Sequence, residues 1–226
     1  YSASLSDPWF GGVQPVQFST SFSHTKQYRY NYFTGRVDKS ASFEITGASV
    51  GLAKRLRIPD DYFTLSQSLA YQYYNLNNYY TGLFPFGDGS SNNLSYTVAL
   101  SRNNTFTNPI FPLGGSEFVL SARFSLPYSL WNGVDYANLG DLEKFQDDDG
   151  NPDPAKIEQE KFKWLEFYKI KFKGSWYTRL FDKLVLRTHT EFGFLGAFNN
   201  DRGVIPFDRF FLGGDGMSQY AMDGRE

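Results

Sequence analysis

The feature that most constrains the fold is a persistent alternation of bulky and small side chains with a period of two. In residues 94–101, Leu94, Tyr96, Val98 and Leu100 alternate with small residues. Such alternation places successive side chains on opposite faces of a β-strand. The pattern recurs in eight segments, separated by turn-forming residues. These segments are 3–5, 16–23, 48–55, 63–73, 94–101, 118–126, 162–176 and 186–194.

The two faces of these predicted strands differ in bulk. One is rich in Phe, Tyr, Leu and Val, whereas most of the other carries Ser, Thr, Gly and Ala. With 23 Phe, 16 Tyr and 4 Trp, aromatic residues make up 19% of the chain. Bulky apolar side chains suit lipid, and small polar ones suit a wet lumen. The mean hydropathy of −0.45 allows this arrangement, because an apolar outside and a polar lumen average out.

The alternation assigns residues to the two expected faces. Residues expected to face lipid are Leu94, Tyr96, Val98, Leu100, Phe118, Leu120 and Phe124, with Ser95, Thr97 and Ser101 facing the lumen. Charged candidates for the lumen face are Arg123, Lys169, Lys171, Arg187, His189 and Glu191.

The connections between the segments differ in length in a regular way. Short turns are expected at 7–13, 56–61 and 177–183, and long loops at 25–41, 75–92 and 127–160, while 103–115 is intermediate where a short one is due. Outer-membrane barrels combine short periplasmic turns with long outer loops. We therefore expect an all-β, transmembrane antiparallel barrel, with the acidic 127–160 loop outside the cell and 177–183 in the periplasm. A soluble sandwich or lipocalin-like barrel, with the bulky face as its interior, remains the alternative.

Eight strands could close a small barrel by themselves. However, the chain begins in the middle of the pattern and ends at Glu226 without a final strand. We therefore expect about eight strands of a larger barrel.

Composition and motifs indicate no enzyme chemistry. The net charge of −2 shows no basic excess for nucleic acid, and the chain has no cysteine. There is no apolar run long enough for a transmembrane helix and no secretory signal at the start. Phosphate loops, nucleophile elbows and zinc-ligand spacings are missing, so no cofactor is expected. His189 with Arg187 and Glu191 could form a site, although charge lining a lumen is the preferred interpretation.

One segment resembles part of a calcium-binding loop. Its potential ligands Asp147, Asp149, Asn151 and Glu158 occupy the first, third, fifth and twelfth positions of such a loop. Pro152 stands where the glycine belongs, and no flanking helices are predicted. A solvated acidic outer loop is the favoured interpretation.

In the last twenty-one residues, 206–226, three aromatic residues, Phe207, Phe210 and Phe211, lead into a stretch rich in glycine. Three motifs in the chain together resemble the BamA-type outer-membrane assembly factors, the surface-antigen barrel family. Leu5-Ser-Asp-Pro-Trp-Phe-Gly-Gly12 is similar to that family's strand-ending turn, and the segment 105–116 to its "F-P-x-x-G-S" turn. Pro206-Phe-Asp-Arg-Phe-Phe-Leu-Gly-Gly214 is similar to the entry into its sixth outer loop. The family's Val-Arg-Gly-Phe/Tyr motif is not found, so its arginine is not assigned to Arg225.

The resemblance implies a sixteen-stranded barrel in the bacterial outer membrane that the chain crosses many times. Residues 1–226 would then be strands four to eleven of a C-terminal barrel domain, ending in the sixth outer loop. POTRA domains would lie upstream and are not part of this chain. The implied function is the assembly and insertion of other barrel proteins; a secretion or translocation barrel and a passive porin are the alternatives. Implied partners are outer-membrane lipids and lipopolysaccharide, unfolded barrel clients and accessory assembly proteins.

By the same resemblance, the glycine-rich segment is expected to turn back into the lumen. The residues expected there are Gly213, Gly214, Asp215, Gly216, Met222, Gly224 and Arg225. Glycines would allow close approach to the wall. Bulky replacements of Gly213 and Gly214 should impair client insertion before they unfold the barrel.

Overall fold

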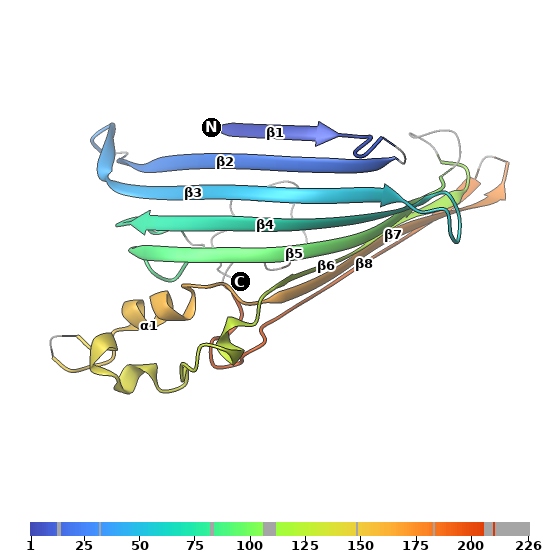
Figure 1. The fold of residues 1–226 in the computed structure, drawn as a ribbon. Helices are drawn as coiled ribbons and strands as arrows, with labels where there is room; N and C mark the ends of the chain where they lie inside the picture. Colours follow the sequence, from blue (N-terminus) through green and yellow to red (C-terminus); the bar gives the residue numbers. More distant parts are fainter. Residues whose placement is uncertain are drawn as a thin grey trace.

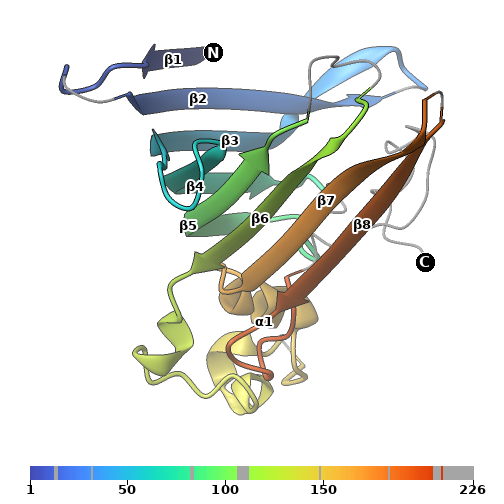
Figure 2. The same ribbon diagram turned by 90° about the vertical axis from the view of Figure 1, so that its right-hand side faces the viewer.

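The computed structural model describes residues 1–12, 15–31, 33–81, 84–105, 112–147, 149–182, 184–205 and 210. Eight strands form one antiparallel sheet in which each strand pairs with the next along the chain (Figure 1). The strands are β1 (Ser2–Asp7), β2 (Val16–Asn31), β3 (Arg36–Arg55), β4 (Phe63–Asn77), β5 (Gly89–Asn103), β6 (Gly115–Ser125), β7 (Tyr168–Phe181) and β8 (Leu184–Gly196). Within the described residues β1 and β8 each have one strand neighbour, so the sheet is open. The direction of the strands rotates across the sheet (Figure 2).

The strand register places the bulky side chains on one face. Leu69 lies opposite Val50 on one side and Tyr96 on the other, and Tyr96 in turn lies opposite Phe124. We call this side of the sheet the aromatic face and the opposite side the small-residue face. Opposed side chains on one face of an antiparallel pair contact each other, as in the tilted Tyr96–Phe124 ring pair with centroids 5.4 Å apart.

The aromatic face remains exposed. Leu69 is 51% exposed and Phe192 54%, in the middle of their strands. A contiguous exposed apolar surface along several strands is typical of a protein that faces lipid or a partner, not water. In the described part of the chain no second layer covers this face, as a soluble sandwich with the bulky face inside would require. None of the described helices is long and apolar enough to cross a bilayer.

Two of the expected long loops are shorter than predicted. Residues 25–41 are not a long loop, because β2 continues to Asn31 and β3 begins at Arg36. Polar residues occupy both faces there, so the alternation in hydrophobicity disappears although the strands continue. The ion pairs Lys26–Glu44 and Arg29–Asp38, the latter 2.6 Å long, link the two strands in this region. The loop expected at 75–92 is also shorter, because β4 ends at Asn77 and β5 begins at Gly89.

The longest connection, between β6 and β7, is folded. It contains three short 3-10 helices, η1 (Tyr128–Leu130), η2 (Leu139–Asp141) and η3 (Glu143–Phe145), and the α-helix α1 (Pro154–Lys161). The Asp153 side chain caps α1 by accepting from the amides of Ala155 and Lys156, with Pro154 in the first turn. The expected strand 162–176 therefore begins six residues late, at Tyr168. Phe162, Trp164 and the lysines at 161 and 163 do not belong to the strand.

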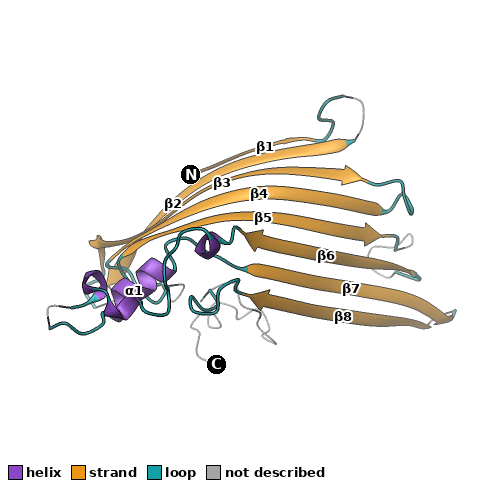
Figure 3. Cartoon of the chain, turned by 60° about the horizontal axis from the view of Figure 1, so that its bottom comes forward, coloured by secondary structure: helices purple, strands orange, loops and turns teal. Residues whose placement is uncertain are grey.

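Loop segments pack onto the small-residue face at one end of the sheet. We call the segments 84–88, 126–147, 149–167 and 197–205 the loop cap. Phe86, Leu165, Phe167 and Ile205 of the loop cap are almost fully buried. They pack with strand residues from the ends of β3 and β4, namely Phe43, Tyr74 and Leu76. Figure 3 shows the helices at this end of the sheet and the β7–β8 turn at the opposite end.

The β1–β2, β3–β4, β5–β6 and β7–β8 connections lie at that opposite end. The Arg102 guanidinium donates to Asp60 in the β3–β4 turn through Nε at 3.0 Å and Nη2 at 2.7 Å, and to Ser116 Oγ at 2.8 Å. Arg102 thus joins the β3–β4 turn to the start of β6. This hydrogen bonding lowers the pKa of the Asp60 carboxyl from its ordinary value.

Candidate functional site: a charged strip on strands β6 to β8

The residues predicted to face the lumen are on the small-residue face. Arg123 lies directly opposite Lys169, and Lys171 lies opposite both Ser121 and Gly193. Arg187, His189 and Glu191 follow at alternate positions of β8, so the structure brings all six charged candidates onto one face. With Lys173 and Glu117 they form what we call the charged strip. It holds five cationic side chains and two carboxylates, so this side of the sheet is electropositive.

Polar contacts organise the strip. Lys171 Nζ lies 2.9 Å from Glu191 Oε1, and His189 Nε2 lies 3.8 Å from Glu191 Oε2. On its other side His189 Nδ1 shares a 3.0 Å hydrogen bond with Ser175 Oγ, which also accepts from Arg187 at 3.3 Å. Lys171 and Glu191 are each 43% exposed. Such half-exposed pairs contribute up to about 1 kcal/mol and leave the strip accessible to a ligand or segment.

Phe210, which lies beyond β8 in the sequence, rests on this strip. A Cβ atom at Gly193 would lie 2.2 Å from the Phe210 ring, and Lys169 Nζ is 4.6 Å from the ring centroid. Gly193 therefore makes room for the ring, and the lysine adds a cation–π contact. The chain thus returns to the small-residue face after leaving β8. The glycine-rich residues Gly213, Gly214, Asp215, Gly216, Met222, Gly224 and Arg225 lie outside the described residues, and their entry into a lumen stays a prediction.

This contact predicts a specific cross-link. Because the chain has no native cysteine, a Gly193→Cys/Phe210→Cys variant carries only the introduced thiols. A short bismaleimide should join them in the folded protein and change its mobility on a denaturing gel. Gly47→Cys with Phe210→Cys is the matched control, since Gly47 lies on the same face of the distant strand β3. Equal cross-linking of both pairs, or of neither, would contradict the placement of Phe210.

The residues predicted to face lipid share the opposite face. Leu94, Tyr96, Val98 and Leu100 of β5 lie on the aromatic face with Phe118, Leu120 and Phe124 of β6. Ser95, Thr97 and Ser101 lie on the small-residue face. The division into two sets agrees with the sequence pattern, while the solvent that each face contacts stays a prediction.

A buried ion pair in the loop cap has no counterpart in the sequence patterns. Arg202 Nη1 donates to Glu166 Oε2 at 2.6 Å, and the two side chains are only 4% and 2% exposed. Arg202 also donates to the carbonyls of Lys161 and Trp164, and Glu166 accepts from the amide and hydroxyl of Ser129. Nearly all the polar atoms of the pair are satisfied, as burial of charge requires. The pair and its hydrogen bonds therefore link three segments of the loop cap, those that contain Ser129, Glu166 and Arg202.

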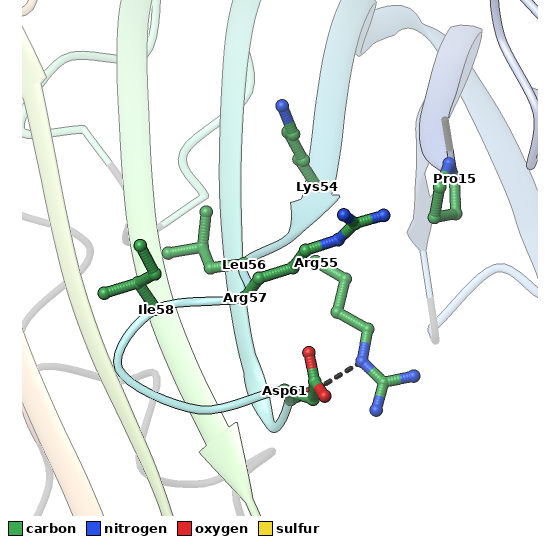
Figure 4. A pocket seen from close by; sticks show the side chains of 7 residues that line it. All are labelled: Pro15, Lys54, Arg55, Leu56, Arg57, Ile58 and Asp61. Carbon is green, nitrogen blue, oxygen red and sulfur yellow. Dashed lines mark hydrogen bonds between the residues drawn. The ribbon is translucent and has the colours of Figure 1, made fainter. Parts of the chain in front are cut away.

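A positively charged pocket opens at the turn end of the sheet. Its volume is about 590 Å³, and Lys54, Arg55 and Arg57 line it together with Pro15 and Asp61. In Figure 4 the two arginine side chains extend toward the Pro15 side, and Leu56 and Ile58 point away from it. Arg55 Nε donates to the backbone carbonyl of Asp61. The pocket lies far from the charged strip's contact with Phe210.

No group of three or more His, Asp or Glu side chains in the described residues could hold a metal ion. In the segment that resembles a calcium loop, the Asp147 carboxylate accepts from the amides of Asp149 and Asn151 at 3.0 and 2.8 Å. It therefore shapes a turn. Glu158 lies on α1, the helix that the sequence analysis missed.

A sheet of consecutive antiparallel strands, aromatic on one face and small or charged on the other, defines the wall of an outer-membrane-type β-barrel. The chain belongs to the Omp85 superfamily, whose domain matches residues 1–218. Among solved structures it is similar to BamA from Haemophilus ducreyi lacking POTRA domains 1-3, with a TM-score of 0.60 and 17% identity. The similarity covers 95% of this chain and 36% of that chain. A comparison with curated proteins found no match.

These findings confirm the fold class and the BamA-type resemblance of the sequence motifs. The chain is an outer-membrane β-barrel protein of the Omp85 type, and it spans about a third of the BamA chain it resembles (36%).

Proposed function

We propose that this chain forms part of the barrel of a protein that inserts and assembles other β-barrel proteins in the bacterial outer membrane, which the chain crosses repeatedly. The observation that carries the proposal is the match of the Omp85 superfamily domain to residues 1–218. The aromatic face would contact lipid, and the small-residue face would line the lumen. The partners would be outer-membrane lipids and lipopolysaccharide, unfolded barrel clients and accessory assembly proteins.

The physical problem for such a protein is the backbone of its client. Each unsatisfied backbone group in hydrocarbon costs several kcal/mol, so a strand enters a membrane readily only if it pairs as it enters. A barrel with an accessible strand edge supplies hydrogen-bond partners for the first client strand. This chain would contribute the stiff part of the wall, because its β2–β5 strands pair over 14 residue positions or more at each junction.

The charged strip would hold the chain segment that follows β8. Its five cations outnumber its two carboxylates, and Phe210 already rests on it. The next residues in the sequence carry carboxylates, Asp215 and Asp223. Pairing between these and the strip would brace the wall from inside, with the loop cap covering the outer end.

Reconstitution tests the proposal. The complete protein in liposomes should accelerate the folding of a urea-unfolded barrel client, followed by the gel shift of folded barrels that have not been heated. Replacing Gly213 and Gly214 with valine should slow client folding while the protein's own gel shift remains. A Gly47→Ala variant on β3, where an added Cβ atom meets only ordinary van der Waals contacts, is the control for loss of glycine as such. Transport of the client across the bilayer would favour a secretion barrel, and ion conductance without any client folding would favour a porin; either result contradicts the proposal.

A further inference from the structure

An aromatic pocket in the loop cap has no role in the proposed function. Its volume is about 370 Å³, within the range of small-molecule sites. Tyr128, Trp131, Tyr136 and Trp164 provide its aromatic walls, and polar groups of Asn132, Glu160 and Lys163 also line it. Tyr128 and Trp164 form a tilted ring pair with centroids 4.8 Å apart. Trp131 is 67% exposed at its side.

The pocket lies where the aromatic face ends. Residues 163–165 pair with β5 beyond the end of β6: Asn92 N donates to Lys163 O, and Leu165 N donates to Asn92 O, both at 2.8 Å. This parallel bridge pairs Trp164 with Asn92, so the two side chains are on the same side of the sheet. Asn92 belongs to the aromatic face, two residues before Leu94, and it accepts a hydrogen bond from Tyr71 at 2.7 Å. Trp and Tyr at such a boundary lie where lipid headgroups begin.

Contacts with neighbouring side chains also fix the position of the Tyr136 ring in the pocket wall. The Arg202 guanidinium, fixed by Glu166, stacks over the Tyr136 ring with its central carbon 4.9 Å from the ring centroid. Asn132 Nδ2 donates to the Tyr136 hydroxyl. Rings that are already positioned lose little entropy when a ligand binds.

Two residues that line the pocket, Tyr128 and Lys163, carry polar groups that differ in accessibility. The Tyr128 hydroxyl is buried and has no hydrogen-bond partner within the described part of the chain. Burial raises the pKa of this hydroxyl above its ordinary value, so it stays protonated. The Lys163 side chain is exposed and carries a positive charge. A ligand that fits must therefore offer an apolar ring face to stack and several hydroxyl or anionic groups to bind.

We propose that this pocket binds the sugar headgroup of a membrane glycolipid. A pyranose ring has C–H faces that stack on Trp and Tyr and hydroxyl groups around its edge that pair with Lys163 and Glu160. The position beside the aromatic face favours a sugar whose lipid chains lie along that face. The inference does not depend on client insertion, because it concerns only the outer surface of the loop cap.

The test uses the complete protein in nanodiscs with three probes. These are lipid A, a lipid built on a glucosamine disaccharide; the soluble disaccharide chitobiose; and phosphatidylglycerol, which is anionic but has no sugar. Lipid retention is measured by native mass spectrometry and chitobiose binding by calorimetry. Trp131→Ala should weaken lipid A binding by about tenfold, the size expected for one lost stacking contact. Trp9→Ala is the matched control, because Trp9 is 57% exposed at the opposite end of the sheet.

Retention of lipid A above phosphatidylglycerol, lost in Trp131→Ala and kept in Trp9→Ala, supports the inference. Chitobiose binding with the same dependence on Trp131 would show that the sugar alone is recognised, and its failure alongside lipid A binding would show that the lipid anchor is needed. Equal retention of lipid A and phosphatidylglycerol, or equal effects of the two tryptophan variants, would overturn it and leave the rings as interfacial anchors.

Discussion

Replacing Arg202 with methionine is expected to destabilise the loop cap by about 3–5 kcal/mol, because it leaves Glu166 charged, buried and without its ion-pair partner. The pair is 2.6 Å long and its side chains are only 4% and 2% exposed, so water cannot readily replace the guanidinium. The Lys161 and Trp164 carbonyls would lose their donor at the same time. Hydrogen exchange of the amides in 161–167, in the folded barrel, measures the free energy of opening.

Two further variants test this explanation. Arg29→Met breaks an exposed pair with Asp38 and should cost at most about 1 kcal/mol. Glu166→Gln added to Arg202→Met removes the stranded charge and should restore more than half of the lost stability. If Arg202→Met were as mild as Arg29→Met, or if the second substitution added a further loss, the buried charge would not be the reason for the effect.

Replacing Leu69 with arginine is expected to cost about 2–4 kcal/mol, whereas the same change at the next residue, Ala70, should be nearly neutral. Leu69 lies near the middle of β4 on the aromatic face and is 51% exposed. Ala70 lies on the small-residue face opposite Ser49 and Ser95, which leave room for a long side chain to reach a wet lumen. An arginine in the hydrocarbon loses its hydration, and one in the lumen keeps it.

Urea unfolding of both variants in lipid vesicles measures the difference directly. Both variants carry the same added arginine in the same strand, so the contribution of the added charge itself cancels in the comparison. Equal stability of the two variants would mean that neither face contacts lipid. Greater damage from Ala70→Arg would mean that the two faces have been assigned the wrong way round.

The alternation of bulky and small side chains along the sequence determined most strands of the sheet and their two faces. The alternation in 94–101 and 118–126 was enough to predict two strands and to divide their residues between faces, because the period of two depends only on the pleat of each strand. The turns between neighbouring strands were predictable from clusters of Gly, Pro and Asp, such as that at 56–61. The pattern failed where both faces are polar, at 25–41, since strand pairing there rests on ion pairs such as Arg29–Asp38 that alternation in hydrophobicity does not report. The helix α1 has a local signal in the sequence, namely Asp153-Pro154 before a run of helix-forming residues, which a search for alternation does not detect.

Only the tertiary structure decided which loop residues contact each other and which strands they pack against. Arg202 and Glu166 are 36 residues apart, and no periodicity connects them. Phe162 and Trp164 continue the alternation of β7 in the sequence, yet one is buried in the loop cap and the other pairs beside β5. The Phe210 ring packs against β8 because Gly193 on that strand has no side chain. Burial of apolar surface and the pairing of buried charges act between segments that meet only in the folded chain, so these contacts lie beyond what local sequence can specify.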